Sequence, residues 1–168
     1  MGASKSLENH SIVKYQPSLH IVLNNPEIPQ NTGAIGRTCV ALQAKLWLVR
    51  PLGFRMDEKT VRRAGLDYWQ HLQWEAVINW ESLVEKLPNQ PFWYFSRFAE
   101  QSFRSVEYSP QCVLVFGSET SGLPKSITEP NQDRLLRIPT AAEVRSLNLA
   151  SSVAVAGYEC QRQLADLS

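Results

Sequence analysis

Cysteine and histidine are scarce in this sequence, and their scarcity argues against two common ways of stabilising a small protein. Each occurs only three times in 168 residues. The cysteines, Cys39, Cys112 and Cys160, are far apart and form no CxxC pair. An odd number of isolated cysteines indicates small buried side chains in a reducing compartment, not a disulfide framework or a zinc site. The histidines are equally scattered, so neither a histidine metal site nor a serine hydrolase triad is supported, and we expect no metal cofactor.

The sequence also lacks a marked excess of charge and any long apolar run. Its formal net charge of +1 argues against a broadly basic surface, so a polyanionic partner would have to be bound by a local patch. No apolar run approaches the roughly 20 residues that span a bilayer, and the polar start has no signal-peptide core. We expect a cytoplasmic protein with no membrane partner, made of a flexible N-terminal extension (1–17) and a single domain (18–168).

Short apolar strands alternate with helical segments along the chain. Strands are predicted over 20–23, 45–49, 73–75, 92–96, 112–116 and 135–139. Helices are predicted over about 31–42, 57–65, 80–86 and 146–164. Asn31 or Thr32 is expected to cap the first helix and Asp57 the second. This alternation is typical of an α/β fold with a mostly parallel sheet flanked by helices.

Two polar loops, 117–124 and 143–149, each follow an apolar strand in the C-terminal half. If those strands pair, the loops lie together beyond the strand ends, where open α/β sheets bind ligands. Gly117 and Gly122 suit a tight turn with exposed amides around a small ligand, and Glu119 can accept hydrogen bonds from that ligand. A plain turn is the alternative. The loop has no lysine in the P-loop position, which disfavours a nucleoside triphosphate.

A second candidate site lies where the first strand gives way to a helix. Segment 31–37 would direct backbone N–H groups and the helix dipole toward a phosphate. Ordinary helix capping with a solvated Arg37 is the alternative. Gly33 and Gly36 resemble part of a dinucleotide fingerprint, but the third glycine and a suitably placed acidic residue are missing. The signature of a nicotinamide cofactor is therefore weak.

The densest basic cluster consists of Arg50, Arg55, Lys59, Arg62 and Arg63. Lys59 and Arg63 are four residues apart on one predicted helix face, and with Arg55 they can follow a nucleic-acid backbone. A solvated face is the alternative. Aromatic residues follow at Tyr68, Trp69, His71 and Trp74. They can either stack on bases or fill the core.

Several motifs occur in a characteristic order along residues 19–164. They are segment 26–33 with Arg37, then 62–68, 116–124, 138–139 and 145–151. Together they resemble the SPOUT superfamily of RNA 2′-O-ribose methyltransferases, in particular its small single-domain branch, which methylates the wobble cytidine or uridine of tRNA. Three positions depart from the family pattern. Ser118 and Ser121 stand where the glycine loop usually has proline and arginine, and Gly36 stands where a bulkier residue is usual.

The resemblance implies a fold, a cofactor and partners. It implies a C-terminal deep trefoil knot, a topology that is rare among proteins. It also implies S-adenosyl-L-methionine as methyl donor, S-adenosyl-L-homocysteine as product, a tRNA substrate, and a homodimer in which two chains build each active site. The cofactor-binding positions that it implies are Tyr94, Phe95, Gly117, Glu119, Ile138, Ser146 and Leu147.

The resemblance also implies catalytic and RNA-binding positions. Arg37 matches an arginine that prepares the ribose hydroxyl, and Asn31, Glu119, Ser146 and Asn148 match motif positions near the transferred methyl group. Tyr158 matches a tyrosine associated with tRNA, which joins the candidate RNA-binding residues Arg55, Lys59, Arg62 and Arg63. Methylation of another tRNA or rRNA ribose and a non-catalytic RNA-binding member of the fold remain alternatives. A nicotinamide oxidoreductase is disfavoured.

Overall fold

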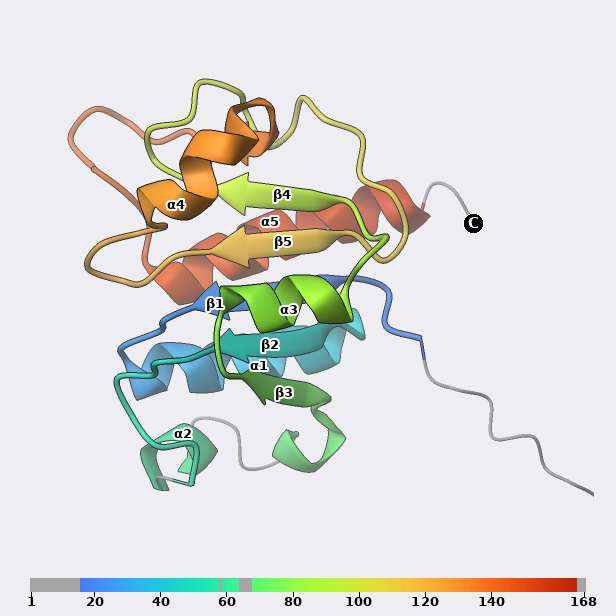
Figure 1. The fold of residues 1–168 in the computed structure, drawn as a ribbon, viewed down its shortest axis with the longest axis vertical. Helices are drawn as coiled ribbons and strands as arrows, with labels where there is room; N and C mark the ends of the chain where they lie inside the picture. The colour runs from blue at the N-terminus through green and yellow to red at the C-terminus, as the bar shows by residue number, and fades with distance from the viewer. Residues whose placement is uncertain (1–15, 58, 64–67, 166–168) are drawn as a thin grey trace, which may run out of the picture.

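A parallel six-stranded sheet forms the centre of the molecule. The computed structural model describes residues 16–57, 59–63 and 68–165, so the expected N-terminal extension lies almost entirely outside the described residues. The strands are β1 His20–Asn24, β2 Lys45–Val49, β3 Trp74–Val77, β4 Phe92–Phe95, β5 Val113–Phe116 and β6 Leu135–Leu136. Their order is β3-β2-β1-β5-β4-β6, and all neighbours pair in parallel (Figure 1). The predicted parallel α/β sheet is confirmed, and all carboxyl ends lie at one edge.

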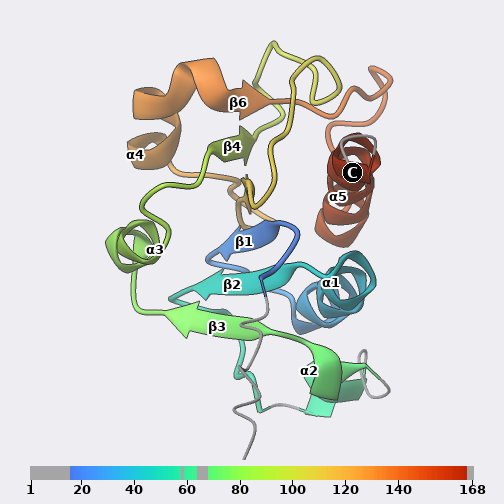
Figure 2. The ribbon, with the colours of Figure 1, turned by 90° about the vertical axis from the view of Figure 1, so that its right-hand side faces the viewer.

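Helices cover both faces of the sheet. The α-helices are α1 Pro29–Leu42, α2 Lys59–Arg63, α3 Trp80–Lys86, α4 Lys125–Thr128 and α5 Leu149–Ala165. Two 3-10 helices, η1 Trp69–His71 and η2 Glu129–Arg134, complete the described elements. Figure 2 shows α1 and α5 side by side on one face, with α3 and α4 on the other. This is the arrangement expected when strands and helices alternate along the chain.

The apolar core has two layers because successive strand residues point to opposite faces. In β1, Ile21 and Leu23 belong to the layer with α1 and α5, whereas Val22 belongs to the layer with α3 and α4. These three side chains are fully buried, as expected for a strand of a parallel sheet covered on both sides. All three cysteines are buried as free thiols, which confirms the prediction that they are core residues.

The start of α1 differs from the prediction. The helix begins at Pro29, its N-cap is Ile28, and no side chain of that cap residue bonds to the helix. Proline suits the first helical position because its fixed φ is already helical and its missing N–H would have no helical partner. Asn31 and Thr32 therefore lie inside the first turn, and the prediction that either caps the helix is wrong. Both side chains are buried.

Three further expectations about the C-terminal half are corrected. β5 and β6 do not pair, because β4 lies between them in the sheet. β6 is also shorter than predicted, since the chain leaves the ladder after Leu136 and keeps only an isolated bridge between Arg137 and Ser102. The last helix begins at Leu149 rather than Ser146 because Asn148 Oδ1 accepts hydrogen bonds from the N–H groups of the following turn.

Candidate functional site

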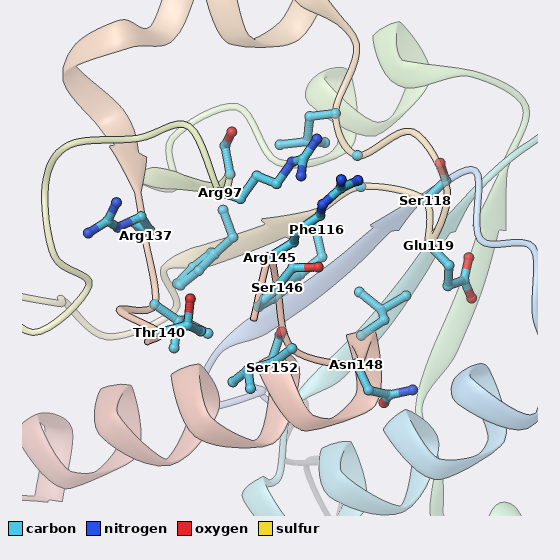
Figure 3. A pocket seen from close by; sticks show the side chains of 18 of the residues that line it. Arg97, Phe116, Ser118, Glu119, Arg137, Thr140, Arg145, Ser146, Asn148 and Ser152 are labelled. Atoms are coloured by element: carbon cyan, nitrogen blue, oxygen red, sulfur yellow. The ribbon is translucent and has the colours of Figure 1, made fainter. Parts of the chain in front are cut away.

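A cavity of about 770 Å³ opens beyond the carboxyl ends of β4, β5 and β6. Its walls come from 95–98, 116–123 and 136–149, with Ile28 and Asn31 at the start of α1. Figure 3 shows side chains from these separate segments converging on one space. Both polar loops singled out in the sequence thus line one cavity, although their strands are not neighbours. A volume of this size is typical of a small-molecule site.

Gly117 opens the loop after β5 and has no room for a side chain. A Cβ at this position would lie 2.1 Å from the carbonyl carbon of Gly122 and 2.3 Å from the nitrogen of Leu123. Gly122 itself has a φ of 67°, a left-handed conformation that favours glycine. The Ser118 hydroxyl accepts a hydrogen bond from the Ser121 N–H at 3.2 Å, so the serine found in place of proline stabilises the turn. The loop is therefore a compact reversal in which Gly117 has no room for a side chain and Gly122 adopts a backbone conformation that favours glycine.

Glu119 ties this loop to the start of α1. Its Oε2 accepts a hydrogen bond from the Glu27 N–H at 2.8 Å, and its Oε1 accepts one from the Ile28 N–H at 3.0 Å. In return, the Thr120 hydroxyl donates to Glu27 Oε2 at 2.9 Å. That bond is the leading cause that lowers the pKa of Glu27. The Glu119 carboxylate also lies where it complements the positive end of the α1 dipole. The Glu119 carboxylate is therefore already hydrogen-bonded to groups of the protein itself.

A chain of side-chain amides extends this connection to the third segment. Asn31 Nδ2 donates to Glu119 Oε1 at 3.3 Å, and Asn31 Oδ1 accepts from Asn148 Nδ2 at 3.1 Å. Asn148 Oδ1 in turn receives the N–H groups of Ala150 and Ser151 at the start of α5. Three predicted catalytic positions therefore form one hydrogen-bonded relay, named here the Glu119–Asn31–Asn148 relay. It holds the starts of α1 and α5 and the glycine loop together.

The floor of the cavity is apolar. The rings of Phe95 and Phe116 stack with centroids 4.6 Å apart and an interplanar angle of 14°. Leu136 is fully buried beside them, and Ile138 and Leu147 add apolar surface to the wall. Such a floor, surrounded by the polar loop backbone, suits a flat ligand that carries polar substituents.

Most of the predicted cofactor positions meet at this cavity. Those that line it are Phe95, Gly117, Glu119, Ile138, Ser146 and Leu147. Tyr94 lies on the opposite side of β4, because neighbouring strand residues alternate between faces. It is buried beside Trp80 and Phe92, and this burial raises the pKa of its hydroxyl.

Arg37 and the predicted RNA-binding residues lie outside the cavity of a single chain. Arg37 is exposed on α1, with its guanidinium carbon 5.3 Å from the centre of the Tyr68 ring. Tyr158, half-exposed on α5, lines a separate shallow hollow with Val155 and Arg104.

The basic cluster lies near the β3 edge of the sheet, around α2 (Figures 1 and 2). Lys59 and Arg63 are exposed on α2, and Arg55 forms an ion pair with Asp57 at 3.4 Å. Arg62 belongs to α2, but its side chain lies outside the described residues. One chain therefore gathers the predicted cofactor positions other than Tyr94 and leaves these basic residues apart from them.

Three arginines at the cavity were not among the predicted site residues, although Arg145 lies in the loop 143–149 singled out in the sequence. Arg97, Arg137 and Arg145 all belong to its wall, and among the described residues that line it Glu119 is the only acidic one. They are far apart in the sequence, so no basic cluster signalled them. The available signal was their place after strands, since Arg97 is the second residue after β4 and Arg137 directly follows β6. The cavity mouth therefore carries more positive than negative charge.

Two absences can be stated for the described part of the chain. Within 16–57, 59–63 and 68–165, no three His, Cys, Asp or Glu side chains are grouped so that they could hold a metal ion. In the same described ranges, no helix has the length and apolar character needed to cross a membrane.

Comparison with known proteins identifies the family. A family model described as "SpoU rRNA Methylase family" matches residues 18–158. The chain belongs to the SpoU methylase family. A Saccharophagus degradans relative of this SpoU family member is named tRNA (cytidine(34)-2′-O)-methyltransferase. The two are 41% identical over 149 residues, which cover 86% of the chain and 95% of the relative. A Bacillus subtilis relative that carries the same name provisionally is 45% identical, over 87% of the chain and 93% of its own length.

Solved structures agree with the family assignment. A structure described as concerning the 2-OH methylation of C/U34 on tRNA superposes with a TM-score of 0.85 at 42% identity, and the match covers 88% of the chain and 97% of that protein. A Bacillus anthracis protein provisionally described as an RNA methyltransferase superposes with a TM-score of 0.83 at 45% identity, covering 88% and 94% of the two chains. The resemblance predicted from the ordered motifs is therefore confirmed.

Proposed function

We propose that this SpoU family member is an S-adenosyl-L-methionine-dependent tRNA 2′-O-ribose methyltransferase that acts on the wobble cytidine or uridine. The observation that carries the proposal is the glycine-loop cavity closed by the Glu119–Asn31–Asn148 relay. It occurs in a chain that is 41–45% identical, over almost its whole length, to relatives named for methylation of cytidine 34 of tRNA. A single domain over 18–168 working in the cytoplasm is part of the same proposal.

The cavity residues fit the methyl donor. An adenosine moiety requires an apolar slot bordered by polar backbone, and the stacked Phe95 and Phe116 rings beside the 117–122 loop supply both. Ile138 and Leu147 add the apolar wall, and Ser146 adds a hydroxyl at the cavity. S-adenosyl-L-methionine, when bound, supplies an activated methyl group on a sulfonium centre.

The relay would contribute to catalysis by alignment. It joins three segments that are distant in sequence, so the loop amides and the Ser146–Asn148 segment keep fixed relative positions. Much of the acceleration of a two-substrate transfer comes from holding the reactants in line, and small displacements are costly. Glu119 and Asn31 are positioning residues in this scheme because their polar atoms already bond to protein groups.

A homodimer belongs to the proposal because a single chain leaves Arg37 outside the cavity wall. A second copy would bring the partner's Arg37 to this site. Exposed apolar surface on α5, at Val155 and Tyr158, supports such an association. Arginine is a poor base because its guanidinium stays protonated and has no acceptor site. Arg37 would therefore orient the ribose hydroxyl and a neighbouring phosphate by donating hydrogen bonds, and the hydroxyl proton would leave to that phosphate or to solvent.

A C-terminal trefoil knot is also proposed. Its support is the path of the chain after β6, which leaves the sheet edge beside β4, lines the cavity over 136–149 and then returns as α5 against α1 and β5. Figure 2 shows the return of α5 from the β6 side to α1. Threading of this path would hold the two cavity loops together without a disulfide.

The test is incubation of the protein with labelled S-adenosyl-L-methionine and unmodified total tRNA, followed by nucleoside mapping. We expect a 2′-O-methylated cytidine or uridine at the wobble position. Arg37→Lys should retain binding of S-adenosyl-L-homocysteine by calorimetry and lose methyl transfer by a large factor. Label at another ribose would change the proposed target, and no methylated ribose at all would refute the proposed activity. A fully active lysine variant would refute the role of Arg37.

A further inference from the structure

Phe98 is an aromatic side chain exposed at the mouth of the cavity. With 79% of its surface exposed, it is the most exposed of the large hydrophobic residues that the structure describes. It belongs to the cavity wall just beyond β4. The turn that carries it is ordered, because the N–H groups of Phe98 and Ala99 donate to the Ser96 hydroxyl and carbonyl, each at 3.2 Å. Ala99 is buried beneath, so the backbone holds the ring outward.

Arg97 lies against this ring. Its guanidinium carbon is 4.5 Å from the centre of the Phe98 ring, which is a cation–π contact. In Figure 3, Arg97 and Arg145 extend toward the same side of the cavity. The two neighbouring side chains Arg97 and Phe98 thus offer one aromatic face and one planar cation at the same edge; this pair is named here the Arg97–Phe98 platform.

The charge around the platform favours a phosphate-bearing ligand. Among the described residues, the cavity wall has three arginines and one carboxylate, Glu119, which already accepts hydrogen bonds from the start of α1, while Glu100 near Phe98 lies outside that wall. Proteins that bind unpaired nucleotides combine such a basic surface with aromatic or guanidinium planes on which bases stack. The platform has both components within two consecutive residues.

The surroundings of Phe98 disfavour other occupants. The apolar part of the methyl donor already has the stacked Phe95 and Phe116 rings in the enclosed part of the cavity. A contact between protein copies generally needs a contiguous apolar patch. Phe98 instead has exposed polar neighbours in Arg97, Glu100 and Gln101. A single aromatic ring among polar groups suits a base, which is flat and has polar edges.

We infer that the Arg97–Phe98 platform stacks one unpaired base of the RNA substrate, adjacent to the nucleotide whose ribose enters the cavity. The inference rests on the proposed function and adds a residue-level account of how that site holds its substrate. Phe98 would supply the stacking face, and Arg97 would hold the ring and contact a phosphate. Because stacking tolerates all four bases, the platform would strengthen binding without selecting a sequence.

The test compares Phe98→Leu and Phe98→Trp with wild type, and Ile78→Ala serves as the control. Ile78 is 74% exposed between β3 and α3, outside the cavity wall. An anticodon stem-loop RNA is titrated by fluorescence anisotropy without methyl donor, and kcat and KM for tRNA are measured separately. We expect Phe98→Leu to weaken RNA binding and raise KM by about ten-fold, as loss of one base stack does. Phe98→Trp and Ile78→Ala should behave like wild type.

Two further measurements separate the alternatives. Calorimetry with S-adenosyl-L-homocysteine and light scattering should give the same affinity and the same mass for Phe98→Leu as for wild type. Unchanged RNA binding by Phe98→Leu would overturn the inference. A loss confined to S-adenosyl-L-homocysteine affinity would also overturn the inference and assign the Phe98 ring to the binding of the methyl donor. A changed mass would overturn it too and assign the ring to a contact with a second copy. Wild-type protein that binds the RNA but methylates none would refute the proposed function. The anisotropy of the Phe98 variants would still show whether the Arg97–Phe98 platform binds RNA.

Discussion

Replacement of Glu119 tests whether the glycine loop is held by the start of α1. The Glu119 carboxylate accepts two backbone N–H groups, from Glu27 at 2.8 Å and from Ile28 at 3.0 Å, and the longer bond from Asn31. A hydrogen bond to a charged group contributes about 1.5–3 kcal/mol. The site is partly exposed, so the released donors would regain water and the lower end of this range applies. We expect Glu119→Ala, which removes two backbone bonds at about 1.5 kcal/mol each, to lower the free energy of unfolding by about 3 kcal/mol.

Glu119→Ala should affect catalysis more than it affects binding of the product S-adenosyl-L-homocysteine. Without the carboxylate, Asn31 loses its acceptor, and the loop keeps the Thr120–Glu27 bond but loses its bonds from Glu119 to the start of α1. Because transfer depends on alignment, we expect kcat to fall at least about ten-fold while affinity for S-adenosyl-L-homocysteine changes less. Glu119→Gln should be intermediate, since the amide keeps one acceptor oxygen but turns an N–H₂ group toward a backbone donor.

Urea unfolding followed by tryptophan fluorescence measures the stability change, and methyl transfer to tRNA measures the catalytic change. Glu85→Gln is the matched control, because Glu85 is an exposed carboxylate on α3, far in sequence from the loop. It should change neither quantity appreciably. Unfolding of Glu119→Ala within about 0.5 kcal/mol of wild type, the usual range for surface changes, together with full activity, would refute the reasoning.

Three further predictions concern other parts of the structure. Gly117→Ala should abolish S-adenosyl-L-homocysteine binding in calorimetry, because its Cβ would overlap the backbone of the same loop; retained affinity would contradict this. Tyr68→Leu should lower kcat a few-fold by releasing Arg37, whereas Tyr68→Phe keeps the ring and should keep kcat. Burial lowers the pKa of His20 from 6.5 to about 4, so its neutral form, which accepts the Trp47 indole N–H, stabilises the fold above pH 6.5. Urea unfolding of wild type should lose up to about 3 kcal/mol between pH 6.5 and pH 4, and His20→Gln should show a flatter profile.

Local patterns predicted the six strands and four of the five α-helices of the described residues, and they missed α4. Strand β2 and helix α3 have the bounds expected from the sequence, Lys45–Val49 and Trp80–Lys86. In α3 the reason is local, since Asn79 Oδ1 accepts the Ser82 N–H and caps the helix. The sequence signals for a helix start were misleading for α1, because the group that bonds to its first residues is distant in sequence. The α1 start is supported by the loop after β5, and no residue near Pro29 reveals that contact.

The sequence by itself determined the α/β class, the buried cysteines and the family. Each of these depends on a pattern that can be read from the order of residues: side-chain periodicity, cysteine spacing and the order of the motifs. Only the tertiary structure decided which of these residues meet. The order β1-β5-β4-β6 brings two loops from non-neighbouring strands to one cavity and leaves Arg37 outside its wall. The same strand order brings the Glu119 carboxylate against the start of α1, where it accepts two backbone N–H groups, and places Phe98 at the cavity mouth. Such convergence depends on strand order and crossover paths, which short-range patterns do not encode.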